Sequence, residues 1–346
     1  MTQGSNANGS FWSRTRSAKK VLVPDLGFLG DTVHLFPALW AIRQAYPEAE
    51  LHLMVAAHIT SLMECVPWVD RVWGYSRFPK HASLAENIGT VRRLRREKFD
   101  VVINLNGSDR SSWLTFLSGA KERLGRVPMD GGPWLWRSMF TEVVEHPFFQ
   151  EPAYEQKWRC LQKAGFRGQE PGFHIEISAQ RLEEAGFSPA DRGTYFHFSP
   201  FSTADRKELP PDMTVELVDA LQEQFPKMKL VLSCAGNERE KKKMEELLKR
   251  VKRQPWRFEA GSLSLMQLTA LIQQSALHLS GDTGPLHLAM MTGTPTVSWF
   301  RAAKGLVEWL PKGPQHRNLI APGASEKGLE GLVLADVLRA AREVAR

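Results

Sequence analysis

A short turn near the end of the chain carries residue types that can hold a phosphorylated ligand. Its sequence, GDTG at residues 281–284, is followed by Pro285 and by apolar residues at helical spacing that end at Gly293. Asp282 or Thr283 can cap this helix, and Pro285 suits its first turn because proline lacks the N–H that would go unpaired there. Such a helix start presents free N–H groups and the positive end of the dipole, which favour phosphate. An ordinary capped turn has the same pattern, so the residues alone allow both interpretations.

A carboxylate and a group of polar side chains follow two strands expected in the first half of the chain. Asp31 lies in the loop after the first strand, and Asn106, Ser108 and Ser111 follow a strand at residues 101–105. Ligands of doubly wound sheets bind at the carboxyl ends of strands, so both loops are expected to border a ligand crevice. A carboxylate there can act as a general base. Asp31 could instead cap the next helix, and the other three residues could equally be turn-formers.

The expected strands and helices alternate along the chain, which indicates an α/β fold with parallel sheets. Strands are expected at residues 21–23, 51–56, 69–73, 101–105, 194–198, 229–233, 276–280 and 296–300. Helices are expected from Pro37 to about Tyr46 and at residues 84–98, 154–164, 213–224, 238–252 and 329–346. With 346 residues, the chain is long enough for two such domains, each with its own core.

The composition is that of a folded protein with an anionic partner. Hydrophobic residues make up 42% of the chain and charged residues 24%, which argues against disorder, and the net charge is +7. No run approaches the roughly 20 apolar residues of a transmembrane helix, and the N-terminal segment lacks the apolar centre of a secretory signal. Cys65, Cys160 and Cys234 are too widely spaced for a metal site and are interpreted as reduced, structural cysteines. These features predict a cytoplasmic protein.

Three separated strings of the chain have counterparts in one known family. They are LGDTVHLFPAL at residues 29–39, SPFSTADRKELP at 199–210 and SGDTGPLH at 280–287, with GNERE at 236–240 between the last two. Together, in this order, they resemble glycosyltransferase family 9, the lipopolysaccharide heptosyltransferases, over nearly the whole chain apart from the N-terminal tail. The resemblance implies a GT-B fold, in which two doubly wound, Rossmann-like domains face each other across a cleft. The donor would bind the C-terminal domain and the acceptor the N-terminal domain.

The resemblance also implies roles for individual residues. Asp31 would be the general base of an inverting transfer, and Lys207 would hold the departing diphosphate. We expect donor contacts from Ser202, Thr203, Arg206, Glu259, Asp282, Thr283, Gly284 and His287. We expect acceptor contacts from Gly30, Asn106, Ser108 and Ser111. No metal and no other cofactor are expected, because a cation with short hydroxyl groups suits a diphosphate. The chain departs from the family at Leu209, where the family usually has Trp, which leaves the local packing open.

The function implied by the resemblance is transfer of a heptose from ADP-heptose to a lipopolysaccharide core sugar at the inner face of the inner membrane. A family member that uses another nucleotide sugar is the nearest alternative. A sugar-nucleotide epimerase or hydrolase of similar fold and a non-catalytic sugar-nucleotide binder are the others. Nucleic acid is not an expected partner, because the basic segment at residues 90–98 has Val91 and Leu94 at the spacing of an amphipathic surface helix.

The expected domain organisation has two folded domains and three further segments. These are a disordered basic tail (1–18), the acceptor-binding domain (19–170), a linker (171–192), the nucleotide-sugar-binding domain (193–325) and a C-terminal helix that packs back across both domains (326–346). Phe11 and Trp12, which precede several basic residues, could touch an anionic membrane, although a solvated tail is the simpler interpretation. Lys19 and Lys20 could help to hold an anionic lipid acceptor.

Overall fold

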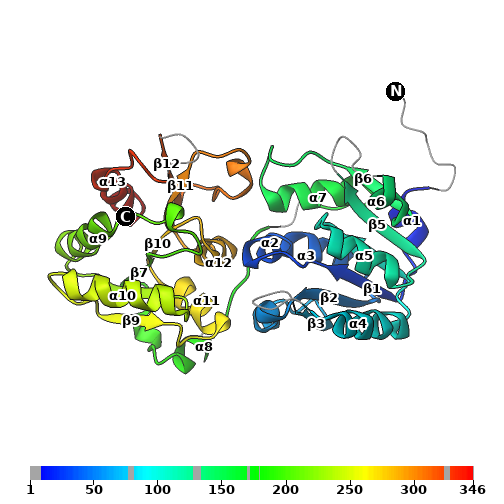
Figure 1. The fold of residues 1–346 in the computed structure, drawn as a ribbon, viewed down its shortest axis with the longest axis horizontal. Helices are drawn as coiled ribbons and strands as arrows, with labels where there is room; N and C mark the ends of the chain where they lie inside the picture. The colour runs from blue at the N-terminus through cyan, green and yellow to red at the C-terminus, as the bar shows by residue number, and fades with distance from the viewer. Residues whose placement is uncertain are drawn as a thin grey trace. The chain divides into compact units, whose positions relative to one another are not determined.

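Figure 1 shows the fold of the chain, a computed structural model. The structure describes residues 9–76, 82–127, 134–169, 172–178, 180–322 and 328–345. The chain divides into two compact units, Met1–Phe173 and His174–Arg346. Each unit contains one parallel sheet, with six strands among the described residues. The expected α/β fold with two doubly wound sheets is therefore confirmed.

The first unit has the strand order β3-β2-β1-β4-β5-β6. Its strands are β1 (Lys20–Pro24), β2 (Glu50–Ala56), β3 (Arg71–Tyr75), β4 (Val101–Asn104), β5 (Glu122–Val127) and β6 (Glu142–Glu145). Its helices are α1 (Phe11–Thr15), α2 (Leu29–Val33), α3 (Phe36–Ala45), the 3-10 helix η1 (Ala57–Cys65), α4 (Leu84–Glu97), α5 (Asp109–Leu117), α6 (Trp134–Ser138) and α7 (Ala153–Lys163). Val21, Leu22 and Val23 of β1 are all buried. Because successive side chains of a strand point to opposite faces, both faces of this sheet are covered.

The second unit has the strand order β12-β11-β10-β7-β8-β9. Its strands are β7 (Tyr195–Ser199), β8 (Lys229–Cys234), β9 (Arg257–Ala260), β10 (Leu277–Gly281), β11 (Thr296–Arg301) and β12 (His316–Ala321). Its helices are α8 (Gln180–Glu184), η2 (Pro189–Asp191), η3 (Asp205–Lys207), α9 (Pro211–Gln224), α10 (Glu238–Arg250), α11 (Leu265–Gln274), α12 (Gly284–Thr292), η4 (Leu306–Glu308) and α13 (Leu334–Val344). A large core cluster joins α9, α10 and α13 to the strands.

Both sheets reverse their strand order at a central pair of strands, β1 and β4 in the first unit and β7 and β10 in the second. Chain connections leave these two strands in opposite directions, so a crevice opens at their carboxyl ends, where ligands of such sheets bind. Asp31, in the short helix α2, and Asn106 follow β1 and β4, and Lys207 and Asp282 follow β7 and β10. The topology therefore gives each unit one ligand-binding edge.

Local chemistry explains where the predicted helices begin and end. The Ser83 hydroxyl and the Glu86 carboxylate form a capping box at the start of α4, and its last residue is followed by Lys98 in a left-handed conformation (φ 55°). Gly293 ends α12 with φ 68°, a conformation that glycine adopts without strain. The helices predicted at residues 84–98 and after Pro285 are therefore confirmed to within a residue or two.

The expected N-terminal tail is partly folded. Ser10 caps α1, and the Phe11 side chain is completely buried. The backbone N–H of Trp12 donates to the Ala164 carbonyl oxygen (3.1 Å), which attaches α1 to the end of α7. The prediction of a disordered tail is wrong for residues 9–18, because burial of an aromatic side chain outweighs the polar composition of the segment. Residues 1–8 lie outside the described residues.

The expected linker at residues 171–192 also packs within a unit where the structure describes it. The Ile175 N–H donates to the Met291 carbonyl oxygen (2.7 Å), and Ile177 exchanges two hydrogen bonds with the Gln273 side chain. Both isoleucines are buried, so this stretch is an edge of the second unit rather than a free connection. Helix α13 starts at Leu334 and packs on α9, β11 and β12. These are all elements of the second unit, and packing of this helix on the first unit stays a prediction.

Candidate functional site

The turn at residues 281–284 has the predicted strand–turn–helix geometry. Strand β10 ends at Gly281, and α12 begins at Gly284 with Pro285 in its first turn. Thr283 is the N-cap residue, but its side chain makes no capping hydrogen bond. Its buried Oγ1 atom has no hydrogen-bond partner among the described residues. The first turn of α12 therefore keeps N–H groups that a bound anion could accept from.

Lys207 reaches this turn from the loop after β7. Its Nζ atom lies 2.6 Å from Asp282 Oδ2 and 3.4 Å from the Asp282 carbonyl oxygen. A Cβ atom on Gly281 would lie 2.6 Å from the Lys207 carbonyl oxygen, so only glycine lets the two loops approach this closely. The structure thus brings together Lys207 and Asp282, which the sequence separates by 75 residues.

A cavity of about 190 Å³ lies next to this ion pair. Its lining includes four basic side chains and one acidic side chain, namely Arg206, Lys207, Arg301, Lys304 and Asp282. Trp299 also lines it, and the buried Trp299 Nε1 and Arg301 Nη1 atoms have no partner among the described residues. Buried donors without partners are costly, and a ligand with several acceptor oxygens would satisfy them. The cavity is therefore suited to an anion such as a diphosphate.

His287 lies in α12 behind the ion pair. Its ring contacts the Trp309 ring edge-on at 5.5 Å between centroids, and its Nε2 atom is 3.9 Å from Asp282 Oδ1. Burial lowers the pKa of His287 to about 4, so the ring is neutral at pH 7. His287 therefore packs behind the turn as a neutral ring rather than as a cation. Its contact with a donor stays a prediction.

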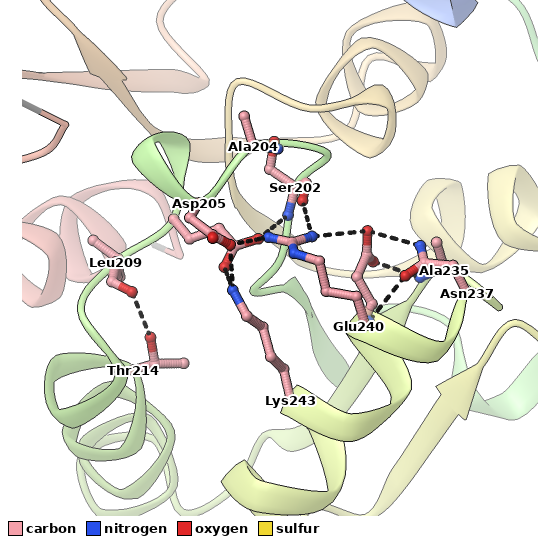
Figure 2. Close-up of polar contacts among 11 residues, drawn as sticks. Ser202, Ala204, Asp205, Leu209, Thr214, Ala235, Asn237, Glu240 and Lys243 are labelled. Atoms are coloured by element: carbon pink, nitrogen blue, oxygen red, sulfur yellow. Dashed lines mark hydrogen bonds and ion pairs between the residues drawn. The ribbon is translucent and has the colours of Figure 1, made fainter. Parts of the chain in front are cut away.

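The loop that carries Lys207 is held by α10, as Figure 2 shows. Arg239 donates to the Ser202 carbonyl oxygen (2.7 Å), to Glu208 Oε1 (2.6 Å) and to Asp205. Lys243 Nζ lies 2.6 Å from both Asp205 Oδ1 and Glu208 Oε2. These contacts connect two acidic residues of the loop, Asp205 and Glu208, to two basic residues of α10, Arg239 and Lys243. Arg239 and Lys243 hold the pKa of Asp205 at about 2, well below its usual range.

The GNERE string at residues 236–240 forms the start of α10. Asn237 caps α10, and Glu240 accepts from the Ala235 N–H (2.8 Å) and from the Asn237 side chain (3.2 Å). These bonds fix the start of α10 and with it the direction of Arg239. An N-cap residue followed three positions later by Glu is a readable signal for the helix start. The ion pairs of Arg239 with Asp205 and Glu208, which lie more than 30 positions away in the sequence, leave no such signal.

The other expected donor residues have different surroundings. Ser202 is buried, and its N–H donates to Glu208 Oε1 (2.9 Å), whereas Thr203 is exposed. Glu259 is buried in β9, where Oε1 pairs with Arg257 (2.5 Å) and Oε2 accepts from the Ser262 hydroxyl. Glu259 is not among the described residues that line the cavity beside Lys207. Its contact with a ribose stays a prediction.

In the first unit, Asp31 lies at the third position of α2. Its Oδ2 atom accepts from the Phe28 N–H (2.8 Å), so the carboxylate caps the helix, as one of the two interpretations proposed. A Cβ atom on Gly27 would lie 2.3 Å from Asp31 Cβ, so glycine makes room for this side chain. Asp31 is only partly buried and stays accessible for proton transfer. A capping role and a basic role are therefore compatible.

A buried ion pair holds the Asp31 loop from behind. Lys157 Nζ, from α7, lies 3.1 Å from Asp25 Oδ2 and donates to the Asp31 carbonyl oxygen (2.6 Å). The two charged side chains are only 6% and 1% exposed. Asp25 Oδ1 accepts from the Gly27 N–H (3.0 Å) and from the Asn106 amide (3.1 Å). Sequence reasoning missed both Asp25 and Lys157, although the position of Asp25 directly after β1 is a signal of the kind that identified Asp31.

The expected acceptor residues are only partly available. Asn106 is half-buried and bonded to Asp25, whereas Gly30 is buried inside α2. Helix α5 begins at Asp109, so Ser111 lies in a helix and not in the loop after β4. Ser108 caps this helix, and the fully buried Ser111 hydroxyl donates to the Ser108 carbonyl oxygen (2.9 Å). For Ser108 and Ser111 the structure shows the turn-forming role, and their contact with an acceptor stays a prediction.

In the part of the chain that the structure describes, no group of three or more His, Cys, Asp or Glu side chains is arranged to hold a metal ion. No helix within the same ranges has both the length and the apolar character that a membrane crossing requires.

Comparison with known proteins gives consistent matches. The family model described as glycosyltransferase family 9 (heptosyltransferase) matches residues 89–323. The lipopolysaccharide core heptosyltransferase OpsX of Haemophilus influenzae is 24% identical over 294 residues, covering 83% of this chain and 80% of that protein.

Two solved structures have the same fold. A glycosyl transferase family 9 protein from Veillonella parvula matches with a TM-score of 0.82 and 21% identity over 94% of this chain and 97% of that one. Escherichia coli heptosyltransferase WaaC with ADP-2-deoxy-2-fluoro heptose matches with a TM-score of 0.75 and 21% identity over 94% and 99%. The family match includes the Lys207 loop and the β10–α12 turn, and it begins after Asp31.

Proposed function

Because the chain belongs to glycosyltransferase family 9 (heptosyltransferase), we propose that it transfers a heptose from ADP-heptose to a sugar of a lipopolysaccharide core. OpsX is named a lipopolysaccharide core heptosyltransferase, and the WaaC structure contains an ADP-heptose analogue. In this chain, the observation that carries the proposal is the basic cavity of about 190 Å³ beside the first turn of α12. An acceptor attached to a lipid would put the reaction at the cytoplasmic face of the inner membrane.

The donor half of the mechanism uses Lys207 and the start of α12. As the bond between the anomeric carbon and the diphosphate breaks, negative charge grows on the departing oxygen. A lysine ammonium and helix N–H groups stabilise that charge more strongly than they stabilise the intact donor. Lys207 now pairs with Asp282, and a diphosphate would compete for the same ammonium. Asp282 would then keep Lys207 aimed at the turn when the site is empty.

The acceptor half uses Asp31. A carboxylate oxygen takes the proton from the acceptor hydroxyl, whose oxygen forms the new bond to the anomeric carbon from the side opposite the diphosphate. The configuration at that carbon is thereby inverted. The hydrogen bond from the Phe28 N–H and the support of Lys157 behind the loop hold the carboxylate in one orientation. Orientation of this kind contributes to rate by keeping the base near the hydroxyl.

The test is mass spectrometry of products formed from a panel of nucleotide sugars and truncated core glycolipids. We expect transfer with ADP-heptose alone among the donors. Asp31→Asn should reduce transfer by about 10²–10⁴-fold, the range of general base catalysis, while donor binding persists. Lys207→Met should weaken donor binding and transfer together. The exposed residues Glu48 and Lys227 provide matched controls, Glu48→Gln and Lys227→Met.

Each alternative has its own outcome in this experiment. Release of free sugar without an acceptor would indicate a hydrolase, and a changed sugar on the nucleotide would indicate an epimerase. Transfer from a different nucleotide sugar would keep the enzyme class and overturn the donor. Nucleotide-sugar binding with no product from any pair would identify a binding protein. Full activity in Asp31→Asn would exclude Asp31 as the base.

A further inference from the structure

The surface formed by α4 and α5 exposes large apolar side chains. Leu84 and Ile88 on α4 are 77% and 44% exposed, and Trp113 and Phe116 on α5 are 45% and 43% exposed. A groove of about 590 Å³ runs between the two helices. Its apolar lining comprises Tyr75, Leu84, Ile88, Val91, Trp113, Leu114 and Leu117. Figure 1 shows the two helices in the first unit. We call this the α4–α5 surface.

The spacing along α4 shows why these side chains are not core residues. The helix buries Thr90 and Leu94 towards the sheet. Leu84 and Ile88, four residues apart, lie on the exposed side of the helix and border the groove, whereas Val91 lies at the inner edge of the groove and packs against the core. Helix α4 therefore has two apolar stripes, and one of them faces outwards. A folded protein rarely exposes contiguous apolar surface of this kind without a partner.

Arginines surround the apolar groove and have no acidic partners. Arg92 and Arg95 of α4 and Arg110 of α5 line the groove, and Arg93 and Arg96 lie beside Arg92 on α4, where they line a neighbouring pocket. Within the described ranges, no carboxylate lies within ion-pair distance of any of the five. Arg43 and Arg239, by contrast, pair with carboxylates of neighbouring elements. The described lining of the groove contains three arginines and one acidic residue, Asp109, so the α4–α5 surface keeps an excess of positive charge that points to an anionic partner.

We propose that the α4–α5 surface docks the enzyme on a lipid bilayer that contains anionic headgroups. Tryptophan and aliphatic side chains insert at the headgroup boundary, and arginines attract anionic lipids. The combination of both on one surface favours a bilayer over a soluble polyanion, which would leave the apolar groove exposed. A second copy of the chain is disfavoured, because a two-fold contact through this surface would place arginines opposite arginines.

This inference rests on the proposed function in one respect, namely that a lipid-linked acceptor requires an enzyme at the membrane. It also assigns the membrane contact to another surface than the N-terminal segment, for which the sequence allows both a membrane contact and a solvated tail. Phe11 is completely buried, Arg14 pairs with Glu122 and Glu142, and Lys20 pairs with Glu50 and Glu97. The aromatic and basic groups of that segment that the structure describes are therefore largely committed to the first unit.

The test is co-sedimentation of the full chain with vesicles of phosphatidylcholine, with and without phosphatidylglycerol. We expect binding only to the anionic vesicles, and loss of binding as salt rises. Each arginine near such a surface contributes about 1 kcal/mol, or about fivefold in affinity, so Arg92→Gln/Arg96→Gln should weaken binding about 25-fold. Trp113→Ser should weaken it by about tenfold at any salt concentration, since its contribution is apolar.

The controls are exposed residues of the second unit. Lys227→Gln/Lys252→Gln removes two charges, and Ile320→Ser removes a side chain that is 48% exposed, as Trp113 is 45% exposed. These variants should bind as the wild type does, and all variants should transfer sugar normally to a water-soluble acceptor. Equal binding to both vesicle types, or equal losses in test and control variants, would overturn the proposal. So would a wild type that ignores vesicles and dimerises through Trp113. Failure of the proposed function would appear separately, as absent transfer with intact vesicle binding.

Discussion

Replacing Lys157 with Met would remove the buried cation that holds the Asp31 loop. Lys157 Nζ lies 3.1 Å from Asp25 Oδ2 and 2.6 Å from the Asp31 carbonyl oxygen. Removing one member of a buried ion pair destabilises a protein by about 3–5 kcal/mol, because the other charge stays buried. Asp25 would keep its hydrogen bonds from Gly27 and Asn106, so we expect the lower end, about 3 kcal/mol.

Urea unfolding would measure this loss in the first unit alone if it is monitored by hydrogen exchange of peptides from β1 and α7. With a urea dependence of about 2 kcal/mol per molar, a loss of about 3 kcal/mol lowers the midpoint by about 1.5 M. The double variant Asp25→Asn/Lys157→Met removes both charges and should recover about 1–2 kcal/mol of the loss. Lys163→Met, on the exposed side of the same helix, is the matched control and should change the midpoint little.

Activity provides a second measurement of the same perturbation. Lys157 does not touch the proposed donor site, so donor binding should not change. The turnover number should fall by about tenfold or more, because a base displaced by a fraction of an ångström is less well aligned with the acceptor hydroxyl. Two results would refute the reasoning: a midpoint for Lys157→Met equal to that of Lys163→Met, or a double variant less stable than the single one. Either would mean that Asp25 and Lys157 are not coupled.

Three further predictions concern the second unit. Gly281→Ala should weaken donor binding by about tenfold, measured by titration calorimetry, since its Cβ would lie 2.6 Å from the Lys207 carbonyl oxygen, a backbone atom that no rotamer change can move. Arg239→Met should raise the donor KM several-fold with a small change in kcat, whereas Lys241→Met on the same helix should change neither. Burial lowers the pKa of His197 to about 3, so its contribution to stability is complete above about pH 6.5 and falls by about 2 kcal/mol at pH 5. Urea midpoints across this range should show the decrease, and a smaller decrease in His197→Asn is expected.

Much of the fold could be predicted because its signals are local. The change from apolar run to helical spacing around Pro285, and the glycine that ends α12, lie within a few residues of the structure they specify. The same holds for the Ser83 capping box of α4. Segments whose structure depends on distant partners were predicted wrongly. Ile175 and Ile177 lie in a polar, glycine-rich stretch, and only their burial against α11 and α12 shows that they belong to a folded unit.

The residues of the candidate site also fall into a group that local signals predicted and a group that depends on distant partners. Asp31, Lys207 and Asp282 follow strands at loop positions that a doubly wound sheet brings to its ligand-binding edge, so their types and positions were informative. Lys157 is one charged residue in a helix whose buried face also includes Gln156 and Trp158, and nothing in its neighbourhood in the sequence distinguishes it from a surface lysine. Its role comes from Asp25, 132 residues away.

The arginines of α4 show how the same local pattern can have two meanings. Val91 and Leu94 at helical spacing correctly predicted an amphipathic surface helix, and that interpretation makes the charged side chains simply solvated. Whether an arginine is balanced depends on which carboxylates its neighbours bring, and neighbours are a property of the fold. On α10, Arg239 meets two acidic residues of a distant loop and stabilises a binding site, whereas on α4 Arg92 and Arg96 meet no carboxylate of the described protein. Arginines without a carboxylate partner, close to the exposed Trp113, can bind an anionic membrane. The vesicle experiment therefore distinguishes a membrane-binding surface from a solvated helix face.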